Sequence, residues 1–481
     1  MSHGLVYDVH DKPKFSHLIV FAIQQVLAIL AATIAVPTII GLPTLIPAAI
    51  LGAGVGTLIY QLLTKFKSPV FLGSSFAFLS SLGVAVAYGY CGVILGSIVA
   101  GLVYVVLALL IHFIGTDWVD KLMPPVIIGP TVALIGLSLA VNAMGDITKA
   151  NASQNYGSYN LVALLCGLIA FFVIIICSTQ KKRMMPRLIP FILGIIAGYA
   201  AAAIFTAIGM ATGSDYLKII DFSPIVNNFY NADGTFRGIT AFVDYPHFAF
   251  IGAIKEITTG NLSVEMLRLT LTPSVLNWSG VAEVVIAFLP VALVVFAEHI
   301  ADHKNLSSII GRDLIKEPGL KRTLLGDGIG SIAGTIFGIC PNTTYGESVG
   351  CVAITKNASV VTITVTAFMC IVLSFISPVM AVLQTIPSCV MGGVCLTLYG
   401  FIAVSGLKMF KDLDLNENKN LFVVAAVLIS GIGGLTIKIP YAISNGEITS
   451  VIQITSIATA LIMGIITNAV LSKFDSKKKK K

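Results

Sequence analysis

Apolar runs of about twenty residues recur along almost the whole chain, and this pattern constrains the fold more than any other feature. Of the 481 residues, 56% are hydrophobic and only 11% are charged, whereas a soluble domain carries about 25% charged residues. A run of this length crosses the hydrocarbon core of a bilayer as one helix. We therefore expect an all-α integral membrane protein with little room for a soluble catalytic domain.

Hydropathy predicts about fourteen spans in two groups of about seven. The first group is expected at residues 18–37, 46–63, 68–84, 93–114, 125–144, 161–178 and 188–208. The second group is expected at residues 280–300, 324–338, 341–355, 360–376, 390–409, 420–437 and 449–471. An odd number of spans in each group makes the second group insert upside down, so the pattern predicts an inverted repeat.

Basic residues gather in short segments between the predicted spans, at 65–67, 181–187 and 304–322, and in the lysine tail 477–481. The positive-inside rule then predicts that both termini are cytoplasmic. The net charge of +7 is therefore explained by topology and does not indicate a nucleic-acid partner. The lysine tail can attract the anionic lipids of the cell membrane. Residues 1–16 are polar and lack the features of a secretory signal, so we expect no processing.

A turn-rich segment, residues 210–279, separates the two groups of spans and is expected to lie outside the cell. Its stretches 248–257 and 264–271 are apolar enough to form interfacial helices. The eight cysteines of the chain match neither a disulfide framework nor a zinc site. We expect them to be packing residues or reduced thiols.

Two predicted spans, the third in each group, are short and interrupted. The first reads Ser68-Pro-Val-Phe-Leu-Gly-Ser-Ser-Phe-Ala-Phe78 and the second reads Cys340-Pro-Asn-Thr-Thr-Tyr-Gly-Glu347. Irregular backbone at membrane depth persists only where it is buried in protein or lines a cavity. Broken spans at matching positions of two inverted repeats mark the binding site of many transporters. We expect these two segments to meet and to offer N–H groups to a polar ligand.

Three acidic residues lie at depths that normally exclude charge. Glu298 ends an apolar run, Asp302 follows on the same helix face, and Glu347 belongs to the second broken span. A carboxylate at the bilayer centre costs about 3 kcal/mol or more, so such residues usually serve a pathway or a site. For Asp302 the competing interpretation is a cytoplasmic helix end, where it would pair with Lys304. With only these three ionised ligands, the region is poorly suited to a metal ion.

A planar heterocycle with alternating N–H and C=O groups suits these acids. Glu298 and Glu347 are expected to contact ring N–H groups, because an ionised carboxylate only accepts hydrogen bonds. Backbone amides near Phe76 and Gly346 are expected to contact the ring carbonyls. Burial raises the proton affinity of an acid, so the same acids are candidates for carrying a proton.

Other polar residues near the acids have structural explanations. We interpret His299 and His303 as satisfied interior residues and leave them without a role. Asp327 is expected to cap or hydrogen-bond a helix end, and Glu283 to be solvated near the outer interface. Gln24, with its neighbour in the first span, fits interhelical packing as well as a site role.

Several long motifs carry a resemblance to a known family. They include Leu72-Gly-Ser-Ser-Phe-Ala-Phe78, Ala297-Glu-His299, Gly311-Arg-Asp-Leu-Ile-Lys-Glu-Pro-Gly319, Pro341-Asn-Thr-Thr-Tyr-Gly-Glu347, Met391-Gly-Gly393 and Leu398-Tyr-Gly400. From about residue 21 to 471 the chain resembles the nucleobase/ascorbate transporters, the nucleobase:cation symporters of the second type, and is most like their bacterial uracil permeases. The resemblance implies an inverted repeat of about fourteen spans, proton-coupled uptake and a homodimer.

The resemblance also implies a division into domains. A core domain would comprise residues 17–115 and 280–383, and a gate domain residues 116–209 and 384–472. The remaining parts would be the cytoplasmic N-terminus 1–16, the extracellular loop 210–279 and the cytoplasmic tail 473–481.

Site residues can be carried over position by position. Glu298 and Glu347 match the substrate-binding acids of the family, and Phe76 and Gly346 match positions whose backbone meets the base. Tyr345 and Tyr399 match residues that line the site, although Tyr399 is equally well explained by packing.

Three residues depart from the familiar uracil permease. Asp302 and Gln25 each stand where that permease has His, and several purine transporters carry Asp at the first of these positions. Ser348 replaces the Asn that usually follows the acid. Because an acid and an imidazole titrate in different pH ranges, the proton route is the property that these departures affect, and we include Asp302 and Gln25 among its candidates.

The sequence therefore predicts a proton-coupled symporter that imports uracil across the cell membrane by alternating access. The alternatives are a proton symporter of purines, xanthine or uric acid, and an anion transporter or channel of the same fold. An enzyme is disfavoured, because no nucleophile–base pair, metal cluster or phosphate loop stands out in the sequence. No cofactor is expected, with the proton as the coupling ion.

Overall fold

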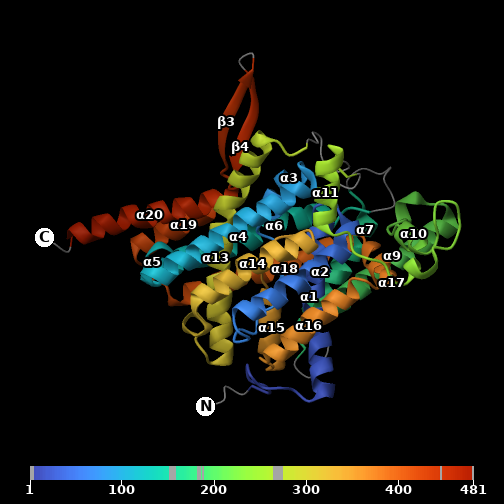
Figure 1. Cartoon of the computed structure of the whole chain (residues 1–481), viewed down its shortest axis with the longest axis horizontal. Helices are drawn as coiled ribbons and strands as arrows, with labels where there is room; N and C mark the ends of the chain where they lie inside the picture. The colour runs from blue at the N-terminus through green and yellow to red at the C-terminus, as the bar shows by residue number, and fades with distance from the viewer. Residues whose placement is uncertain are drawn as a thin grey trace.

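The computed structural model describes residues 5–150, 159–180, 186, 189–263, 275–444 and 447–478. It is a mostly helical protein with two small two-stranded sheets (Figure 1). In this described part, nine helices are long and apolar enough to cross a membrane. The prediction of a multi-pass helical membrane protein is confirmed to this extent.

The first bundle contains both broken spans and the helices around them. Within it α14 packs on α2 and α4, α16 packs on α1 and α2, and α13 packs on α4. Its helices are α1 (Phe15–Ile39), α2 (Ile46–Leu63), α3 (Leu79–Val86), α4 (Gly89–Ile114), α13 (Trp278–Ile310), α14 (Leu320–Phe337), α15 (Gly346–Thr355) and α16 (Val360–Leu373). Short turns η1 (Pro43–Leu45) and η5 (Ile315–Gly319) precede α2 and α14.

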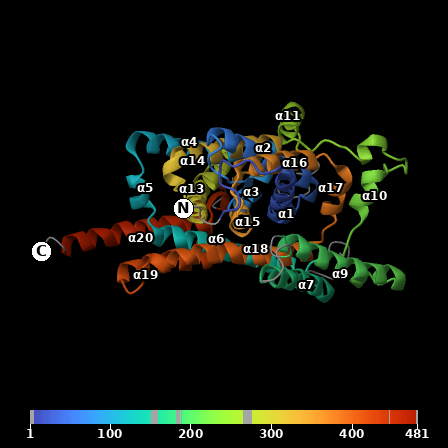
Figure 2. The same cartoon turned by 90° about the horizontal axis from the view of Figure 1, so that it is seen from below.

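The second bundle forms a separate layer, which Figure 2 shows edge-on beneath the first. In it α6 packs on α18, α19 and α20, and α7 packs on α9 and α18. Its helices are α6 (Pro125–Asp146), α7 (Leu161–Ser178), α9 (Pro190–Thr212), α18 (Ser388–Lys408), α19 (Asn418–Ile432) and α20 (Ser456–Lys478). Helix α5 (Asp117–Leu122) leads into α6, α17 (Ser377–Gln384) leads from α16 to α18, and η6 (Met409–Asp412) follows α18.

Local sequence explains where several helices begin. The side chain of Asn277 accepts a hydrogen bond from the Gly280 N–H at the start of α13, and Asn160 caps α7 in the same way. Such caps satisfy N–H groups that have no partner within the helix. The predicted spans that are not among the nine long helices are shorter or more polar. Helices α16 and α19, for example, are apolar but only 14 and 15 residues long.

The last two predicted spans are wrong at their boundary. Residues 437–454 do not continue α19 or begin α20, because β3 (Ile437–Ser444) and β4 (Glu447–Ile454) form an antiparallel hairpin there. The span expected at 420–437 therefore ends at Ile432, and the span expected at 449–471 begins at Ser456. In Figure 1 the hairpin projects away from both bundles.

Glycines allow α2 and α14 to pack backbone against backbone. A Cβ added to Gly52 of α2 would lie 2.2 Å from the carbonyl oxygen of Gly334 in α14. One turn further, a Cβ on Gly56 would lie 2.7 Å from the Gly330 carbonyl oxygen. Small residues of this kind let membrane helices approach closely, and here they hold the two helices that flank the broken spans.

The connecting segment, residues 210–279, contacts both bundles. Near its start, the N–H groups of Ile219 and Ile220 donate to the Thr206 hydroxyl on α9. Further along, the N–H of Asp244 donates to the Phe375 carbonyl at the junction of α16 and α17. The described part of the segment contains η3 (Asp215–Leu217), α10 (Ser223–Phe229), η4 (Gly238–Ala241) and α11 (Ala249–Thr259).

Helix α11 docks on α4 and α14 of the first bundle. The Glu256 carboxylate, 1% exposed, accepts hydrogen bonds from the backbone N–H of Cys91 at 3.2 Å and of Ser263 at 3.3 Å. It thereby caps the N-terminus of α4, where Gly89 has φ +68° and no space for a Cβ. The prediction of a helix at 248–257 is confirmed, and the stretch 264–271 lies outside the described residues.

Candidate functional site

The two broken spans meet in an antiparallel pair of short strands. Strand β1 (Leu72–Ser74) pairs with β2 (Asn342–Thr344), with Gly73 opposite Thr343. The ladder is extended at both ends, because the Tyr345 N–H donates to the Phe71 carbonyl and the Ser75 N–H donates to the Pro341 carbonyl. The prediction that these segments meet is confirmed. Pairing them satisfies backbone groups that would otherwise be unpaired inside the bundle.

A helix begins beyond the crossing on each side. Helix α15 starts at Gly346, with Tyr345 as its N-cap residue, so Glu347 lies in its first turn. On the other side α3 starts at Leu79, three residues after Phe76. The first N–H groups of a helix have no partner within it and carry partial positive charge. The crossing therefore presents backbone donors beside an acidic residue.

Helix α13 brings two more acids to this crossing. Glu298 is half-buried, and its Oε2 is buried with no hydrogen-bond partner among the described residues. Asp302, one turn later, is 8% exposed and accepts a hydrogen bond from the Thr344 hydroxyl at 2.7 Å. The electrostatic neighbours of Glu298 include Asp302 and Glu347. The three acids are thus brought into one region from two elements.

This contact contradicts one of the two interpretations of Asp302. The carboxyl does not pair with Lys304 at a helix end, because its partner is Thr344 on the second broken span. Among the described residues, no group of three or more His, Cys, Asp or Glu side chains is arranged to hold a metal ion.

Gln25 joins the site through the residue that follows Glu347. Its side-chain amide donates to the Ser348 hydroxyl, and the two residues are 3% and 0% exposed. Gln25 and Ser348 are two of the three positions at which the chain departs from the familiar uracil permease. The structure shows that the side chains of Gln25 and Ser348 contact each other.

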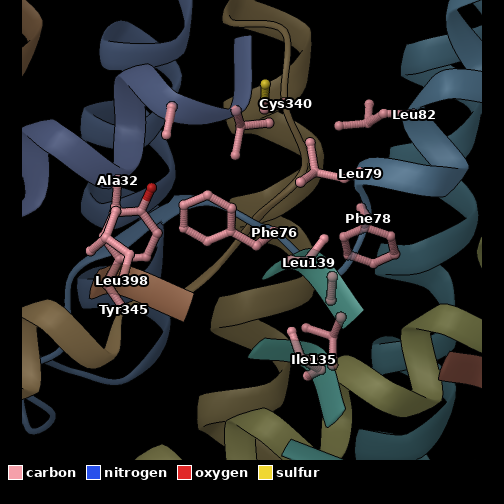
Figure 3. Packing of buried hydrophobic residues seen from close by; sticks show 14 of the residues in the cluster. Ala32, Phe76, Phe78, Leu79, Leu82, Ile135, Leu139, Cys340, Tyr345 and Leu398 are labelled. Atoms are coloured by element: carbon pink, nitrogen blue, oxygen red, sulfur yellow. The ribbon is translucent and has the colours of Figure 1, made fainter. Parts of the chain in front are cut away.

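Aromatic rings from both bundles close over the crossing. The ring of Phe76 meets that of Tyr399 on α18 edge to face, with centroids 5.3 Å apart. Tyr345 donates its hydroxyl to the Ser74 carbonyl at 3.1 Å. Figure 3 shows Phe76 and Tyr345 in one apolar cluster with Leu398 and Ala32. Phe76 and Tyr399 therefore contact each other where the two bundles meet.

A cavity of about 240 Å³ lies between the bundles. Its lining includes Leu79, Ser80 and Gly83 of α3 and Asn142 of α6. Leu79 also belongs to the apolar cluster in Figure 3. The cavity thus lies along α3, the helix that follows the first broken span.

A buried polar network supports α13 behind the acids. The His299 ring contacts Asp327 Oδ2 at 2.7 Å and the Thr323 hydroxyl at 3.0 Å. The His303 ring contacts the Tyr60 hydroxyl at 2.8 Å. The prediction for the two histidines as satisfied interior residues is confirmed. Asp327 has a structural role, as expected, but its predicted position at a helix end is wrong, because it lies inside α14 and pairs with the imidazole.

Glu283 is only half-buried, on the first turns of α13. Its Oε2 accepts a hydrogen bond from the Tyr88 hydroxyl at 2.6 Å. The expectation of a purely solvated residue is therefore incomplete, because this acid pairs with Tyr88, the residue just before α4.

Sequence comparison places the chain in a family. A model of the xanthine/uracil permeases, described as "Permease family", matches residues 16–439. The chain belongs to this family. It is 35% identical to the uracil permease of Bacillus caldolyticus, a match that covers 97% of this chain and 94% of that one. It is 34% identical to the uracil permease of Bacillus subtilis (96% and 94% covered) and 30% identical to that of Escherichia coli K12 (95% and 94% covered).

Solved structures show where this permease stands among folds. The transmembrane domain of the cyanobacterial bicarbonate transporter BicA has a TM-score of 0.55 at 13% identity, covering 96% of this chain and all of that one. The murine anion transporter Slc26a9, in its inward-facing state, has a TM-score of 0.62 at 11% identity, covering 97% of this chain and 69% of that one. This permease shares their inverted-repeat transporter fold. It is a multi-pass membrane transporter and not an enzyme.

Proposed function

We propose that the permease imports uracil together with protons across the cell membrane by alternating access. One observation carries the proposal: the pairing of β1 with β2 brings Glu347 to the same crossing as Glu298. In such a site the two carboxylates accept hydrogen bonds from ring N–H groups. Relatives that carry the name uracil permease match nearly the full length of the chain, which favours this base.

The remaining residues have defined places in the proposal. The backbone near Phe76 and Gly346 meets the ring carbonyls, and Tyr345 and Tyr399 line the site. A proton enters on one of the acids, with Asp302 and Gln25 on its route. The uracil that enters is released on the other side unchanged, and the proton follows the same direction.

We assign the moving parts to the two bundles. The first bundle corresponds to the core domain, residues 17–115 and 280–383, and the second to the gate domain, residues 116–209 and 384–472. Because Phe76 and Tyr399 come from different bundles, relative movement of core and gate separates their rings. The basic segments favour a cytoplasmic position for both termini, and the family resemblance favours a homodimer.

Uptake by purified protein in liposomes tests the site. Glu298→Gln and Glu347→Gln are each expected to reduce uptake of radiolabelled uracil by about tenfold or more, because each removes a charged acceptor. Glu283→Gln is the matched control, since this acid lies on the same helix and pairs with Tyr88. Normal uptake by either site variant would remove that residue from the site.

Purine transport is the second candidate, favoured by Asp302 at a position where several purine transporters also have Asp. Competition of labelled uracil uptake by unlabelled uracil, xanthine and uric acid separates the two. If a purine competes more strongly than unlabelled uracil, that purine and not uracil is the proposed substrate. Imposing a pH gradient in the same liposomes tests whether uptake is coupled to protons. An uptake rate that does not change with the gradient contradicts a proton symporter.

A further inference from the structure

Thr344 is the last residue of β2, and its hydroxyl reaches across to α13. It is 1% exposed, and its Oγ1 lies 2.7 Å from Oδ2 of Asp302. The backbone of Thr344 is opposite Leu72 in the paired strands. The side chain therefore joins a helix that carries acids to the point where the broken spans cross.

Two buried threonines in helices use their hydroxyl differently. Thr131 on α6 and Thr366 on α16 each donate to a carbonyl one turn earlier in their own helix. Because Thr344 lies in a strand, no such carbonyl is available to it. Its hydroxyl instead contacts a titratable group 42 positions away in sequence.

The chemistry of the pair suits a group that gains and loses a proton. An ionised carboxylate only accepts, and the Thr344 hydroxyl then donates to it. A protonated carboxyl can donate its own proton, and the same hydroxyl oxygen then accepts it. The contact can therefore persist in both states of Asp302. No apolar side chain can do this.

The surroundings of Asp302 make this hydroxyl important. The carboxyl is faced by Glu347 from α15 and by Asp327 from α14, and by Glu298 on its own helix. The imidazoles of His299 and His303 on the same helix are bonded to α14 and α2. While ionised, these acidic neighbours can only accept hydrogen bonds and give the Asp302 carboxylate no donor. The donor on its carboxyl is the uncharged Thr344 hydroxyl.

We propose that Thr344 is a positioning residue for proton coupling, which holds the Asp302 carboxyl against the crossing and sets the pH range in which it exchanges its proton. This inference rests on the proposed function of the site. Tyr345, Gly346 and Glu347 follow Thr344 directly in the chain. A change of charge on Asp302 therefore acts on the segment that carries the substrate-binding acid.

The test compares Thr344→Val with Thr344→Ser in liposomes across about pH 5 to 9. Valine keeps the shape and loses the hydroxyl, so the ionised carboxylate loses its donor. The pH at which uracil uptake falls to half its maximum is expected to rise by about one unit. Thr344→Ser is expected to keep the wild-type profile, and so is Thr131→Val, the control for removing a buried hydroxyl. A wild-type profile in Thr344→Val would overturn the inference.

A second measurement does not depend on transport. Infrared difference spectra of the purified protein, wild type against Asp302→Asn, identify the absorption of the protonated Asp302 carboxyl. Its titration midpoint is expected to rise by about one pH unit in Thr344→Val or, should valine prevent folding, in Thr344→Ala. An unchanged midpoint overturns the inference even if uptake is lost. If the midpoint shifts in Thr344→Val but the wild-type protein takes up no base, the role of Thr344 stands and the proposed function is contradicted instead.

Discussion

The close approach of α2 and α14 makes Gly52→Ala the sharpest test of the packing. The new Cβ would lie 2.2 Å from the Gly334 carbonyl oxygen, 3.1 Å from the Gly334 carbonyl carbon and 3.2 Å from Cα of Gly338. All three atoms belong to the backbone, so no side chain can turn away. Ordinary contact begins at 3.4 Å, and the helices must therefore separate by about 1 Å.

The free-energy cost of this separation can be approximated from the destabilisation that added methyl groups cause in well-packed protein interiors. Extra methyl groups in packed interiors typically cost about 1–3 kcal/mol, and a clash with backbone belongs at the upper end. The displacement also strains the hydrogen bond from the Asn342 side-chain amide to the Gly52 carbonyl, 2.9 Å long. We expect the free energy of unfolding to fall by about 3 kcal/mol. Because Asn342 begins β2, uptake should fall as well.

Denaturation of the purified protein in mixed detergent micelles measures the effect. Gly400→Ala is the matched control, because this glycine lies within α18 and a Cβ there would meet nothing within 4 Å. Replacing it should leave stability unchanged or raise it by up to about 1 kcal/mol. Equal stability of Gly52→Ala and the wild type would refute the packing of these two helices through their backbones.

Two further substitutions test buried polar groups. Tyr60→Phe removes a fully buried hydroxyl that contacts both Ser68 and His303 at 2.8 Å, and it should destabilise the protein by about 1–3 kcal/mol in the same assay; a change below about 0.5 kcal/mol would contradict the network. Burial raises the pKa of Glu256 above its ordinary value, although backbone N–H groups such as that of Cys91 lower it. The folded form then binds this proton more tightly than the unfolded form, so the contribution of Glu256 to stability is greatest at low pH and declines as pH rises above the ordinary value. Glu256→Gln, which does not titrate, should therefore gain stability relative to the wild type between about pH 4.5 and 7, and a constant difference over that range would contradict the burial effect.

The sequence predicts the position of most helices because each apolar run is long and is bounded by polar residues. It also predicts the meeting of the two broken spans, since Pro and Gly interrupt both at matching places. The hairpin at 437–454 was missed for a physical reason. A window of about twenty residues averages over a two-residue alternation, and Ile437-Lys-Ile439 and Ile452-Gln-Ile454 alternate in this way. The dipeptide Asn445-Gly446 between them is typical of hairpin turns and is the signal that could have identified it.

The contacts within the site could not be predicted. Gln25 and Ser348 are 323 positions apart, and Thr344 and Asp302 are 42 positions apart. Such pairs are formed by the packing of whole helices, and hydropathy contains no information on which side chains will meet. Thr344 was visible only as one of two threonines in a polar run. Asp327 shows the same limit. Its partner is the buried imidazole of His299, but its neighbours in sequence suggest only a residue at a helix end.

The connecting segment ties together parts that alternating access must separate. One end is bonded to α9, its middle to the junction of α16 and α17, and its far helix to the start of α4. Between Asp244, bonded at the junction, and Ala249, where α11 begins, the chain spans at most about 17 Å when fully extended. This short connection holds α11 to the first bundle, because α11 docks on α4 and the junction lies at the end of α16. The Thr206 hydroxyl joins the segment to α9 of the second bundle, so a movement between the bundles must be taken up between Ile220 and Asp244 or must break that contact.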